Sequence, residues 1–207
     1  NTDFTCGPSS LLMALSALSK KIKPCLEEEL TIWREATTIF MTSGHGGCGP
    51  RGLALSAFKR GFRSEVWISQ KKPLFLEGLR AQSKKDILKI VYSVFEKQIK
   101  KAKIPTIYKK LSSEDLERAL KNNKIPIVLI SMYKLTKSKS PHWVVVAGYD
   151  ENHFYIHDPA LDIDSGYSQS SRQLPDVAYL PVKKSTFLKM AKYGTSKVQS
   201  TVIIYKK

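Results

Sequence analysis

Residues 141–159 read Pro141-His-Trp-Val-Val-Val-Ala-Gly-Tyr-Asp-Glu-Asn-His-Phe-Tyr-Ile-His-Asp-Pro159, and this stretch decides how the second half of the chain folds. Residues 143–149 and 154–157 are rich in aromatic and β-branched types, which favour strands. Residues 150–152 between them include polar types that favour turns. The stretch therefore predicts an antiparallel hairpin with a three-residue turn that pairs Tyr149 with His153.

Apolar patterning on either side of this hairpin predicts the remaining elements. We expect strands at residues 64–69, 127–132 and 201–205, and helices at residues 8–19, 24–38, 50–60, 86–103, 113–122 and 183–193. Helices thus dominate the first half of the chain and an antiparallel sheet the second, which is an α+β fold. In this layout the N-terminal helices pack on the C-terminal sheet.

Several helices carry residues that we expect to face the core or to cap the helix. Ser112 is expected to cap the helix that follows it, with Asp115 completing a capping box and Leu111 packing on Leu116. The predicted core-facing residues are Leu11, Leu15 and Leu18 in the first helix, Leu26, Leu30, Trp33 and Thr37 in the second, and Ile87, Ile90, Val91, Val94 and Phe95 in helix 86–103.

Composition bounds the function of this 207-residue chain, which is long enough to form a sizeable core. We expect a single domain over residues 1–207 and, since no apolar stretch reaches about 20 residues, no membrane span. Net charge is +16, from 34 Lys and Arg against 18 Asp and Glu, which favours acidic partners. The lysines are scattered and no nucleic-acid-binding motif accompanies them, so we expect a solvated lysine-rich surface and no nucleic-acid partner.

Cysteine usage fits a reducing compartment. Cys6, Cys25 and Cys48 are odd in number, so at least one thiol is free, and the chain has no C-x-x-C pair. We therefore expect a cytoplasmic protein with no metal and no cofactor. A zinc site formed by His45 with the cysteines is the alternative, but the spacing is not typical of one.

A second informative stretch is Asn1-Thr-Asp-Phe-Thr-Cys-Gly-Pro-Ser-Ser10, directly before an apolar helical run. A helix N-terminus carries partial positive charge, which stabilises a thiolate over a thiol. Gly7 permits the close approach of another segment, and Pro8 suits a first helical turn. Cys6 is therefore a candidate nucleophile, with a buried structural thiol as an equal alternative when Cys6 is taken alone.

A cysteine nucleophile needs a general base and a group that orients the base. With a three-residue turn, His142 faces position 160 of the hairpin. Asp158 then lies diagonally from His142 on the same face, within reach of its Nδ1, whereas His157 points to the other face. We predict His142 as the base and Asp158 as its partner, although a two-residue turn would reverse this choice.

The glycine-rich loop Thr42-Ser-Gly-His-Gly-Gly-Cys-Gly49 lies between the second and third predicted helices. Such loops bring backbone amides close to a ligand. We expect His45, Gly46 and Cys48 to form a substrate-binding wall, with a plain connecting turn as the alternative. Trp143, next to the predicted base, either covers the site or packs in the core.

Three motifs together resemble those of the bacteriocin-processing, double-glycine leader peptidases, which are papain-like cysteine peptidases. The motifs span most of the chain and read Asp3-Phe-Thr-Cys-Gly-Pro-Ser-Ser-Leu11, Pro141-His-Trp-Val-Val-Val-Ala-Gly-Tyr-Asp150 and Tyr155-Ile-His-Asp-Pro159. The resemblance implies a papain-like fold in which Cys6 is the nucleophile, His142 is the base and Asp158 orients the base.

Three further expectations follow from the same resemblance. Residues 33–48 are similar to a bacterial branch in which an acetyltransferase domain often precedes the peptidase-like domain, so we expect a longer chain with an upstream domain. The glutamine that helps to form the oxyanion hole in the family, six residues before the cysteine, would fall just upstream of Asn1. Residues 71–110 are longer than the matching part of compact leader peptidases, and we expect them to be a family-specific insertion.

The sequence thus predicts a cysteine peptidase that cleaves a peptide or amide bond through an acyl-enzyme. Its expected partner is a peptide or protein substrate, and the net charge favours an acidic one. The alternative is a catalytically weak peptidase-like module that binds acidic peptides through its lysine-rich surface, and a nucleic-acid-binding role ranks third. Hydrolysis, transfer and deamidation all stay open at this stage.

Overall fold

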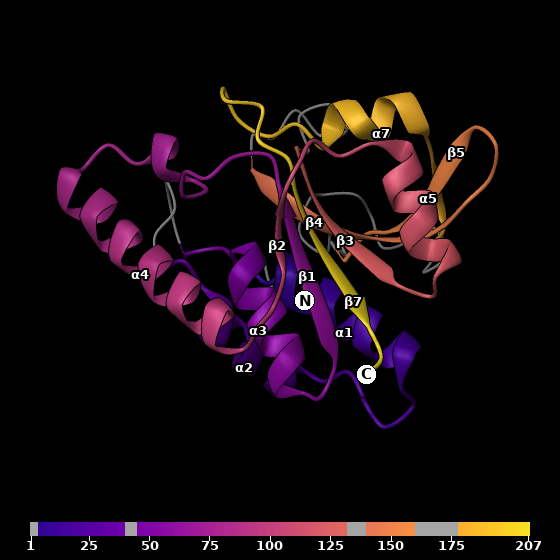
Figure 1. Ribbon diagram of the computed structural model, residues 1–207, viewed down its shortest axis with the longest axis horizontal. Helices are drawn as coiled ribbons and strands as arrows, with labels where there is room; N and C mark the ends of the chain where they lie inside the picture. The colour runs from indigo at the N-terminus through magenta and orange to yellow at the C-terminus, as the bar shows by residue number, and fades with distance from the viewer. Residues whose placement is uncertain (1–3, 40–44, 132–139, 160–177) are drawn as a thin grey trace, which may run out of the picture.

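The computed structural model describes residues 4–39, 45–131, 140–159 and 178–207 of the chain, and Figure 1 shows their arrangement. The helices are α1 (Cys6–Leu18), α2 (Leu26–Ala36), α3 (Pro50–Lys59), the short 3-10 helix η1 (Leu76–Gly78), α4 (Gln82–Lys101), α5 (Ser113–Lys121) and α7 (Lys184–Met190). The strands are β1 (Arg63–Ile68), β2 (Thr106–Tyr108), β3 (Ile125–Ser131), β4 (Pro141–Tyr149), β5 (His153–His157), β6 (Leu180–Lys183) and β7 (Ser200–Tyr205).

The described strands form one sheet, in the order β2-β1-β7-β3-β4-β5-β6. β1 and β2 pair in parallel, and the other neighbours pair antiparallel. β7 is the last strand in the chain, yet it lies between β1 and β3 in the middle of the sheet (Figure 1). The expected α+β fold, with helices packed on a largely antiparallel sheet, is confirmed.

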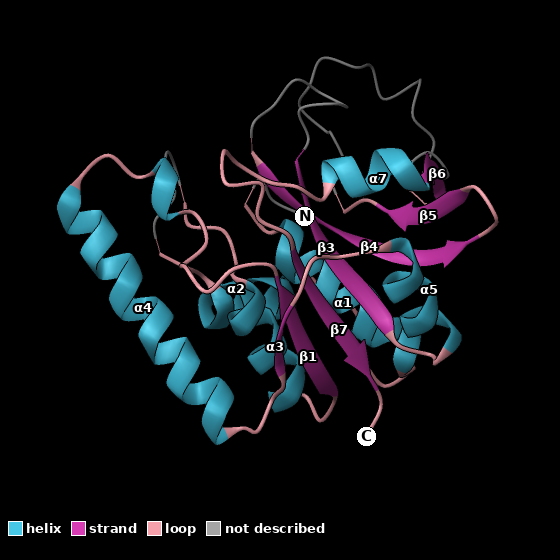
Figure 2. Cartoon of the chain, turned by 45° about the horizontal axis from the view of Figure 1, so that its top comes forward, coloured by secondary structure: helices cyan, strands magenta, loops and turns pink. Residues whose placement is uncertain are grey.

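Each face of the sheet carries a buried apolar cluster, because side chains along the central strands alternate between the two faces. In β4, Trp143 and Val145 pack with residues of α1, α2 and α3, whereas Val144 and Val146 pack with residues of α5 and α7. In Figure 1, α1, α2 and α3 lie together in the lower part of the view, away from α5 and α7, and Figure 2 shows α7 next to β5 and β6. β4 is thus covered on both faces, which fixes the position of His142 near its start.

Two helices follow their local sequence signals closely. α1 buries Leu11 and Leu15 completely, as their spacing predicts, and Leu18 is partly buried. At the start of α5, the Asp115 amide donates a hydrogen bond to the Ser112 hydroxyl, and the Ser112 amide donates one to the Asp115 carboxylate. The expected capping box is therefore confirmed.

α2 turns a different face to the core from the one that its leucines predict. Leu26 is 56% exposed and Leu30 is 36% exposed, whereas Ile32 is fully buried. The helix is rotated so that Glu29 points inward, where its carboxylate accepts a hydrogen bond from the Thr5 hydroxyl. The prediction of Leu26 and Leu30 as core residues is wrong, because a buried polar contact sets the orientation of this helix.

α4 also buries a narrower face than predicted. Ile90 is 63% exposed, and Ile87 and Val94 are exposed as well, while Leu88 and Ile99 are buried. The helix lies at the edge of the molecule against α3, so only one stripe of it is covered (Figure 1). Neither α4 nor another helix in the described part of the chain has the length and apolar character needed to cross a membrane.

Two strands, β2 and β6, were not predicted from the sequence. β2 is three residues long, and β6 has four residues that include Pro181. They are the two outermost strands of the described sheet, where short length and proline are tolerated. Segments this short carry too little alternation to signal a strand.

Candidate active site

α1 approaches β4 closely at its first turn, because residue 7 is a glycine. A Cβ atom on Gly7 would lie 3.1 Å from Cys48 Cβ and 3.2 Å from Trp143 Cδ1. Three residues later, the Ser10 hydroxyl donates a hydrogen bond of 2.9 Å to the Trp143 carbonyl. Glycine and serine thus hold the start of α1 against the strand that carries His142.

Cys6 is the first residue of α1, and it is partly buried. Amides in the first turn of a helix have no acceptor within the helix, and they give this end a partial positive charge. The first turn of α1, which the structure describes in full, contains no acidic residue that would offset that charge. The position therefore suits a cysteine that reacts as a thiolate.

His142 and Asp158 form a close pair on the hairpin of β4 and β5. His142 Nε2 lies 2.6 Å from Asp158 Oδ1, and both side chains are buried. His142 is the second residue of β4, and Asp158 directly follows β5. Hydrogen bonds between ionised groups are stronger than neutral ones, and burial shields this one from water. The expectation that these two residues meet is confirmed.

The turn between β4 and β5 is shorter than predicted. The Asp150 amide donates to the His153 carbonyl across a two-residue turn, so Tyr149 pairs with Phe154 and not with His153. A shift of one residue moves the side chains of a strand to the opposite face. By itself, this turn would separate the predicted base from its partner.

A β-bulge further along the hairpin reverses that shift. The pairing changes register between Val146 and Gly148, and beyond this point Val145 pairs with His157, as it would with a three-residue turn. A bulge places one extra residue in one strand of the pair. The predicted base and its partner therefore meet on one face through two offsets that cancel, neither of which the sequence pattern predicts.

Electrostatic interactions at His142 favour its protonated form. Burial lowers the pKa of His142, but hydrogen bonds with Asp158 and Cys6, together with their charges, outweigh burial and raise this pKa to about 10. Asp158 bonds Nε2 of the ring, which corrects the expectation that it bonds Nδ1. Nδ1 is then the nitrogen left for the Cys6 thiol, so one imidazole can serve both the carboxylate and the sulfur.

We expect folding to take up a proton at His142, because its pKa rises from 6.5 to about 10 in the native protein. The stability that this group contributes is fully present below pH 6.5 and is lost as the pH rises toward 10. In that window the free energy of unfolding should fall by up to about 1.4 kcal/mol per pH unit. Urea unfolding of the Cys6→Ala protein at several pH values measures this slope, because a Cys6 thiol that gives its proton to His142 would cancel the proton uptake in the wild-type protein. Asp158→Asn should flatten it, and equal slopes in the two proteins would contradict the assignment.

Of the predicted substrate-binding wall, His45 is exposed and Gly46 is buried. The His45 ring stacks on Phe4, with centroids 4.6 Å apart. A Cβ atom on Gly46 would lie 2.5 Å from the carbonyl carbon of Ile39, and Trp33 Nε1 donates a hydrogen bond of 2.8 Å to the Gly46 carbonyl. Close backbone packing against the end of α2 thus explains this glycine.

Cys48 and Trp143 lie in the core beside the start of α1. Each is 2% exposed, and Trp143 Nε1 donates a hydrogen bond of 3.0 Å to the Cys48 carbonyl. Burial, followed by the nearby charge of Cys6, raises the pKa of the Cys48 thiol. We therefore assign these two side chains to the support of α1 and not to the substrate-binding wall.

A buried polar contact that was not predicted from the sequence lies next to Cys6. Thr5 is fully buried, and its hydroxyl donates a hydrogen bond to the Glu29 carboxylate of α2. The Thr5 carbonyl accepts hydrogen bonds from the amide and the hydroxyl of Ser9. The contact therefore ties the first turn of α1 to α2, and no sequence signal distinguishes Glu29 from its two glutamate neighbours.

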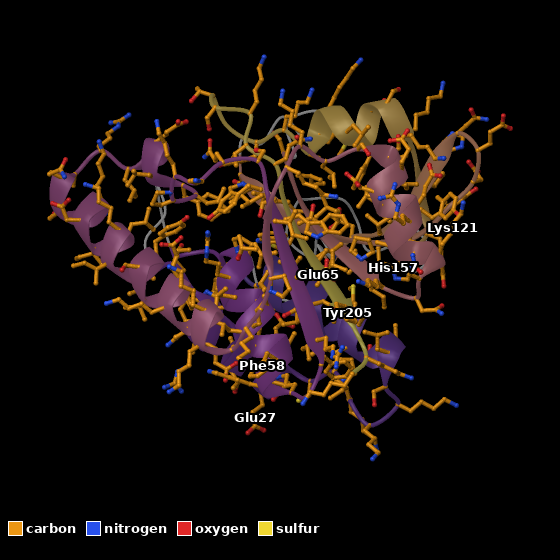
Figure 3. All side chains as sticks on the ribbon, viewed as in Figure 1. Glu27, Phe58, Glu65, Lys121, His157 and Tyr205 are labelled. Atoms are coloured by element: carbon orange, nitrogen blue, oxygen red, sulfur yellow. The ribbon has the colours of Figure 1, made fainter. Side chains whose placement is uncertain are left out.

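The imidazole of His157 is a further titratable group, and it lies apart from the His142–Asp158 pair. The His157 ring meets the Tyr179 ring edge-on, with centroids 4.5 Å apart, and burial lowers the pKa of His157 (labelled in Figure 3). His157 precedes Asp158 in the chain, so its side chain points to the other face, as expected.

Among the residues that the structure describes, no group of three His, Cys, Asp or Glu side chains could hold a metal ion.

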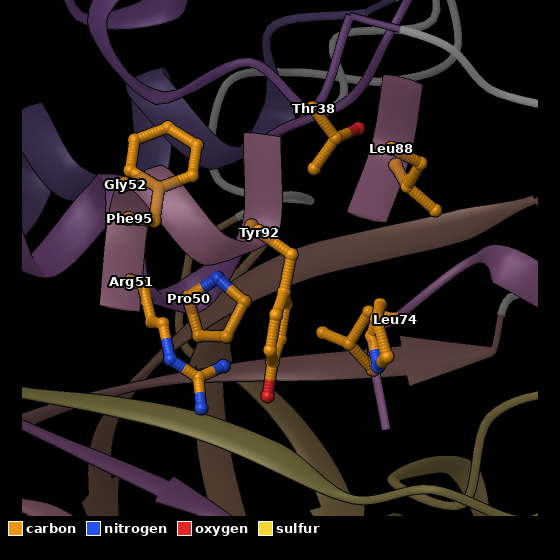
Figure 4. A pocket seen from close by; sticks show the side chains of 10 residues that line it. Thr38, Pro50, Arg51, Gly52, Leu74, Leu88, Tyr92 and Phe95 are labelled. Carbon is orange, nitrogen blue, oxygen red and sulfur yellow. The ribbon is translucent and has the colours of Figure 1, made fainter. Parts of the chain in front are cut away.

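A small cavity between α3 and α4 is not part of this site (Figure 4). Its volume is about 30 Å³, which is close to the share of one water molecule in the liquid. Arg51 in its wall is buried, and the guanidinium lies over the Tyr92 ring, 4.4 Å from the centroid. The cavity is a small packing defect at the interface between α4 and the core.

A cysteine at the start of the first helix, together with a histidine–carboxylate pair on an antiparallel sheet, defines a papain-like scaffold. A candidate C39-like peptidase from Bacillus anthracis has the same fold, with a TM-score of 0.53 and 13% sequence identity over 99% of this chain and 90% of that one. The model of the Peptidase_C39-like family matches residues 1–205, and the chain belongs to this family. No curated protein matches the chain.

Proposed function

We propose that this protein is a cysteine peptidase that hydrolyses peptide or amide bonds through an acyl-enzyme. The observation that carries the proposal is the 2.6 Å contact between His142 Nε2 and Asp158 Oδ1, and the interaction of His142 with Cys6 that raises the pKa of the imidazole supports it. Membership of a peptidase-like family supports the same class of reaction. The alternative of a binding module with little activity has no comparable support.

In the proposed resting state His142 already holds the thiol proton of Cys6, and in the first step the thiolate sulfur attacks the carbonyl carbon of the substrate. His142 then donates that proton to the leaving amine as the C–N bond breaks, which leaves a thioester on Cys6. Water attacks the thioester with His142 as base, the C–S bond breaks, and the acid leaves. Asp158 orients the imidazole and stabilises its protonated form in both steps.

The oxyanion that forms in each step requires hydrogen-bond donors. We propose the Cys6 amide as one donor, because it lies at the first position of α1, where amides have no helical acceptor. In the family that the motifs resemble, a glutamine side chain supplies a second donor. The positive end of the helix would add to the stabilisation of the negative charge.

The proposed substrate is a peptide or protein, and the net charge of +16 favours an acidic one. A closer relation to the bacteriocin-processing peptidases and an upstream acetyltransferase domain are finer proposals, supported by the motif resemblance alone. Double-glycine leader specificity is not carried over, because residues 71–110 are longer than the matching part of compact leader peptidases. Cysteine usage supports the further proposal of a cytoplasmic location. The resemblance supports the proposal that residues 71–110 are a family-specific insertion.

Digestion of an internally quenched peptide library in ¹⁸O-enriched water tests the proposal. We expect new carboxyl ends that carry ¹⁸O at the enrichment of the solvent, because water resolves the acyl-enzyme. Mass spectrometry of the products measures the label, and products joined to an amine would identify transfer instead. A library left intact by the wild-type protein would contradict the proposal.

A further inference from the structure

α4 has two rows of apolar side chains, and the protein buries only one of them. Leu88 and Ile99 are buried, and Phe95 packs against the core beside them. The second row, which we call the α4 stripe, consists of Ile87, Ile90, Val91 and Val94. Residues three or four apart lie on the same side of a helix, so the α4 stripe forms one continuous apolar side.

The α4 stripe is exposed to solvent over two turns of the helix. Ile90 is 63% exposed, Val94 is 46% exposed and Ile87 is 39% exposed, while Val91 is partly buried. Single exposed apolar residues are common on protein surfaces, but a contiguous group of them is typical of an interaction site. β-branched residues are also poorer helix formers than alanine, glutamate or lysine, so helix propensity does not explain them at exposed positions.

The charges of α4 favour an acidic partner. The helix contains six lysines and two acidic residues. Both acidic side chains already form ion pairs within the protein, Asp86 with Lys89 at 3.1 Å and Glu96 with Arg51 at 3.4 Å. The surface that α4 presents to a partner is therefore positive, and it attracts carboxylates.

Lysines lie beyond both ends of the α4 stripe. Lys84 precedes Ile87 by three residues, Lys97 follows Val94 by three, and Lys101 follows one turn later. A second copy of α4, laid along the stripe in either direction, would bring lysines against lysines, and this repulsion disfavours a self-interaction. A partner with carboxylates at both ends of its own apolar row meets opposite charge instead.

The direction of the α4 stripe favours a rod-shaped partner over a flat membrane surface. With 3.6 residues per turn, the side of α4 opposite Leu88 carries Asp86, Ser93 and Lys97 together with Ile90. The rest of the α4 stripe lies to one side of this outermost line. A bilayer would therefore meet polar groups first, whereas a helix laid alongside α4 covers the whole stripe.

We infer that α4 is a docking site for an acidic amphipathic helix of a partner protein. The apolar side of that helix packs along the α4 stripe, and its Asp and Glu side chains pair with the lysines at the two ends. α4 packs mainly on α3 at one edge of the molecule, so this contact leaves the start of α1 open (Figure 1). The stripe lies outside the three motifs of the family resemblance, and the inference goes beyond the proposed function.

A stapled helical peptide of about 18 residues tests the docking site, since it spans the roughly 25 Å from Lys84 to Lys101. This probe has leucine at every third or fourth position along one side, glutamate near both ends and alanine elsewhere. Fluorescence anisotropy measures its dissociation constant with the Cys6→Ala protein, so that cleavage does not consume the probe.

The double variant Ile90→Ser, Val94→Ser should raise this dissociation constant at least about 10-fold, because it removes apolar area from the contact. Serine has nearly the helix propensity of isoleucine and valine, so α4 is retained. The matched control Leu26→Ser, Leu30→Ser replaces two exposed leucines of α2 and should change the constant less than about twofold. A probe that does not bind, or equal constants for the two double variants, would overturn the inference.

Charge reversal tests the lysines at the end of the α4 stripe. The variant Lys97→Glu, Lys101→Glu should weaken binding at least about 10-fold at about 50 mM salt. The control Lys206→Glu, Lys207→Glu makes the same change in net charge at the C-terminus and should stay within about twofold. A second probe of equal composition, with its leucines spread around the helix, should bind at least about 10-fold more weakly. Equal binding of the two probes would reduce the contact to charge alone and overturn the apolar docking site.

Two further measurements test other occupants of the α4 stripe. Sedimentation velocity detects a dimer, and cosedimentation with vesicles of phosphatidylcholine and phosphatidylserine detects membrane binding. Dimerisation or vesicle binding that the variant Ile90→Ser, Val94→Ser loses would overturn the inference. Cleavage of an internally quenched peptide by this variant should stay within about twofold of the wild-type rate, which separates docking from catalysis.

Discussion

Cys6→Ala should lower kcat/KM for peptide cleavage by at least about 10,000-fold, because it removes the atom that forms the acyl-enzyme. The other thiol beside the start of α1, Cys48, is buried and has a raised pKa, so it does not replace this sulfur. The measurement is the initial rate of cleavage of an internally quenched peptide. Circular dichroism of the variant should match the wild-type protein, since a partly buried cysteine gives way to a smaller residue.

Cys25→Ala is the matched control for this substitution. Cys25 is exposed at the N-cap of α2, and its side chain makes no capping hydrogen bond. Its loss should leave the rate of cleavage within about twofold of the wild-type rate. A Cys6→Ala protein that retains more than about 1% of the wild-type rate would contradict the role of Cys6.

His142→Gln should lower kcat/KM by about 100- to 10,000-fold, the range that general acid–base catalysis spans. Glutamine retains a hydrogen-bonding side chain of similar size, but it cannot carry a proton between Cys6 and the leaving amine. The loss should be larger at pH 6 than at pH 9, because a pKa of about 10 keeps His142 protonated across this range, whereas a thiol without that imidazolium ionises only as the pH rises. Rates measured from pH 5 to pH 9 record the effect.

His157→Gln provides the comparison for this variant. His157 is next to Asp158 in the chain but lies on the other face, with its ring against Tyr179. We expect its substitution to change kcat/KM less than about threefold. Equal losses in the two glutamine variants would show that the effect of His142→Gln is structural and would contradict its role as base.

Features that depend on neighbouring residues were predictable from the sequence. The capping box of Ser112 and Asp115 involves two residues of one turn, and the burial of Leu11 and Leu15 follows the period of one helix. These features need no knowledge of the rest of the fold. They are correct because local and tertiary preferences agree at these positions.

Features that depend on contacts between elements were not predictable in the same way. The orientation of α2 is set by the hydrogen bond from Thr5 to Glu29, across 24 residues of sequence. The exposure of Ile90 in α4 reflects the position of that helix at the edge of the molecule. Hydrophobic periodicity identifies a helix but does not say how wide a face its neighbours will cover.

The candidate site combines both kinds of feature. Residue types and strand alternation predicted that His142 and Asp158 share a face, and their 2.6 Å contact confirms it. The path to this contact differs from the prediction, because a shorter turn and a bulge offset each other.

The rate at which iodoacetamide alkylates Cys6 at pH 6 tests most directly whether His142 holds this residue ready as a nucleophile. At this pH an ordinary thiol with a pKa near 8.5 is about 0.3% ionised, whereas the raised pKa of His142 keeps the imidazole positively charged beside the sulfur. Exposed Cys25 is an internal reference in the same sample. We predict that Cys6 reacts at least about 30-fold faster than Cys25 in peptide mass spectra, and that His142→Gln removes the difference. Equal rates for Cys6 and Cys25 in the wild-type protein would contradict a thiolate–imidazolium pair at this site.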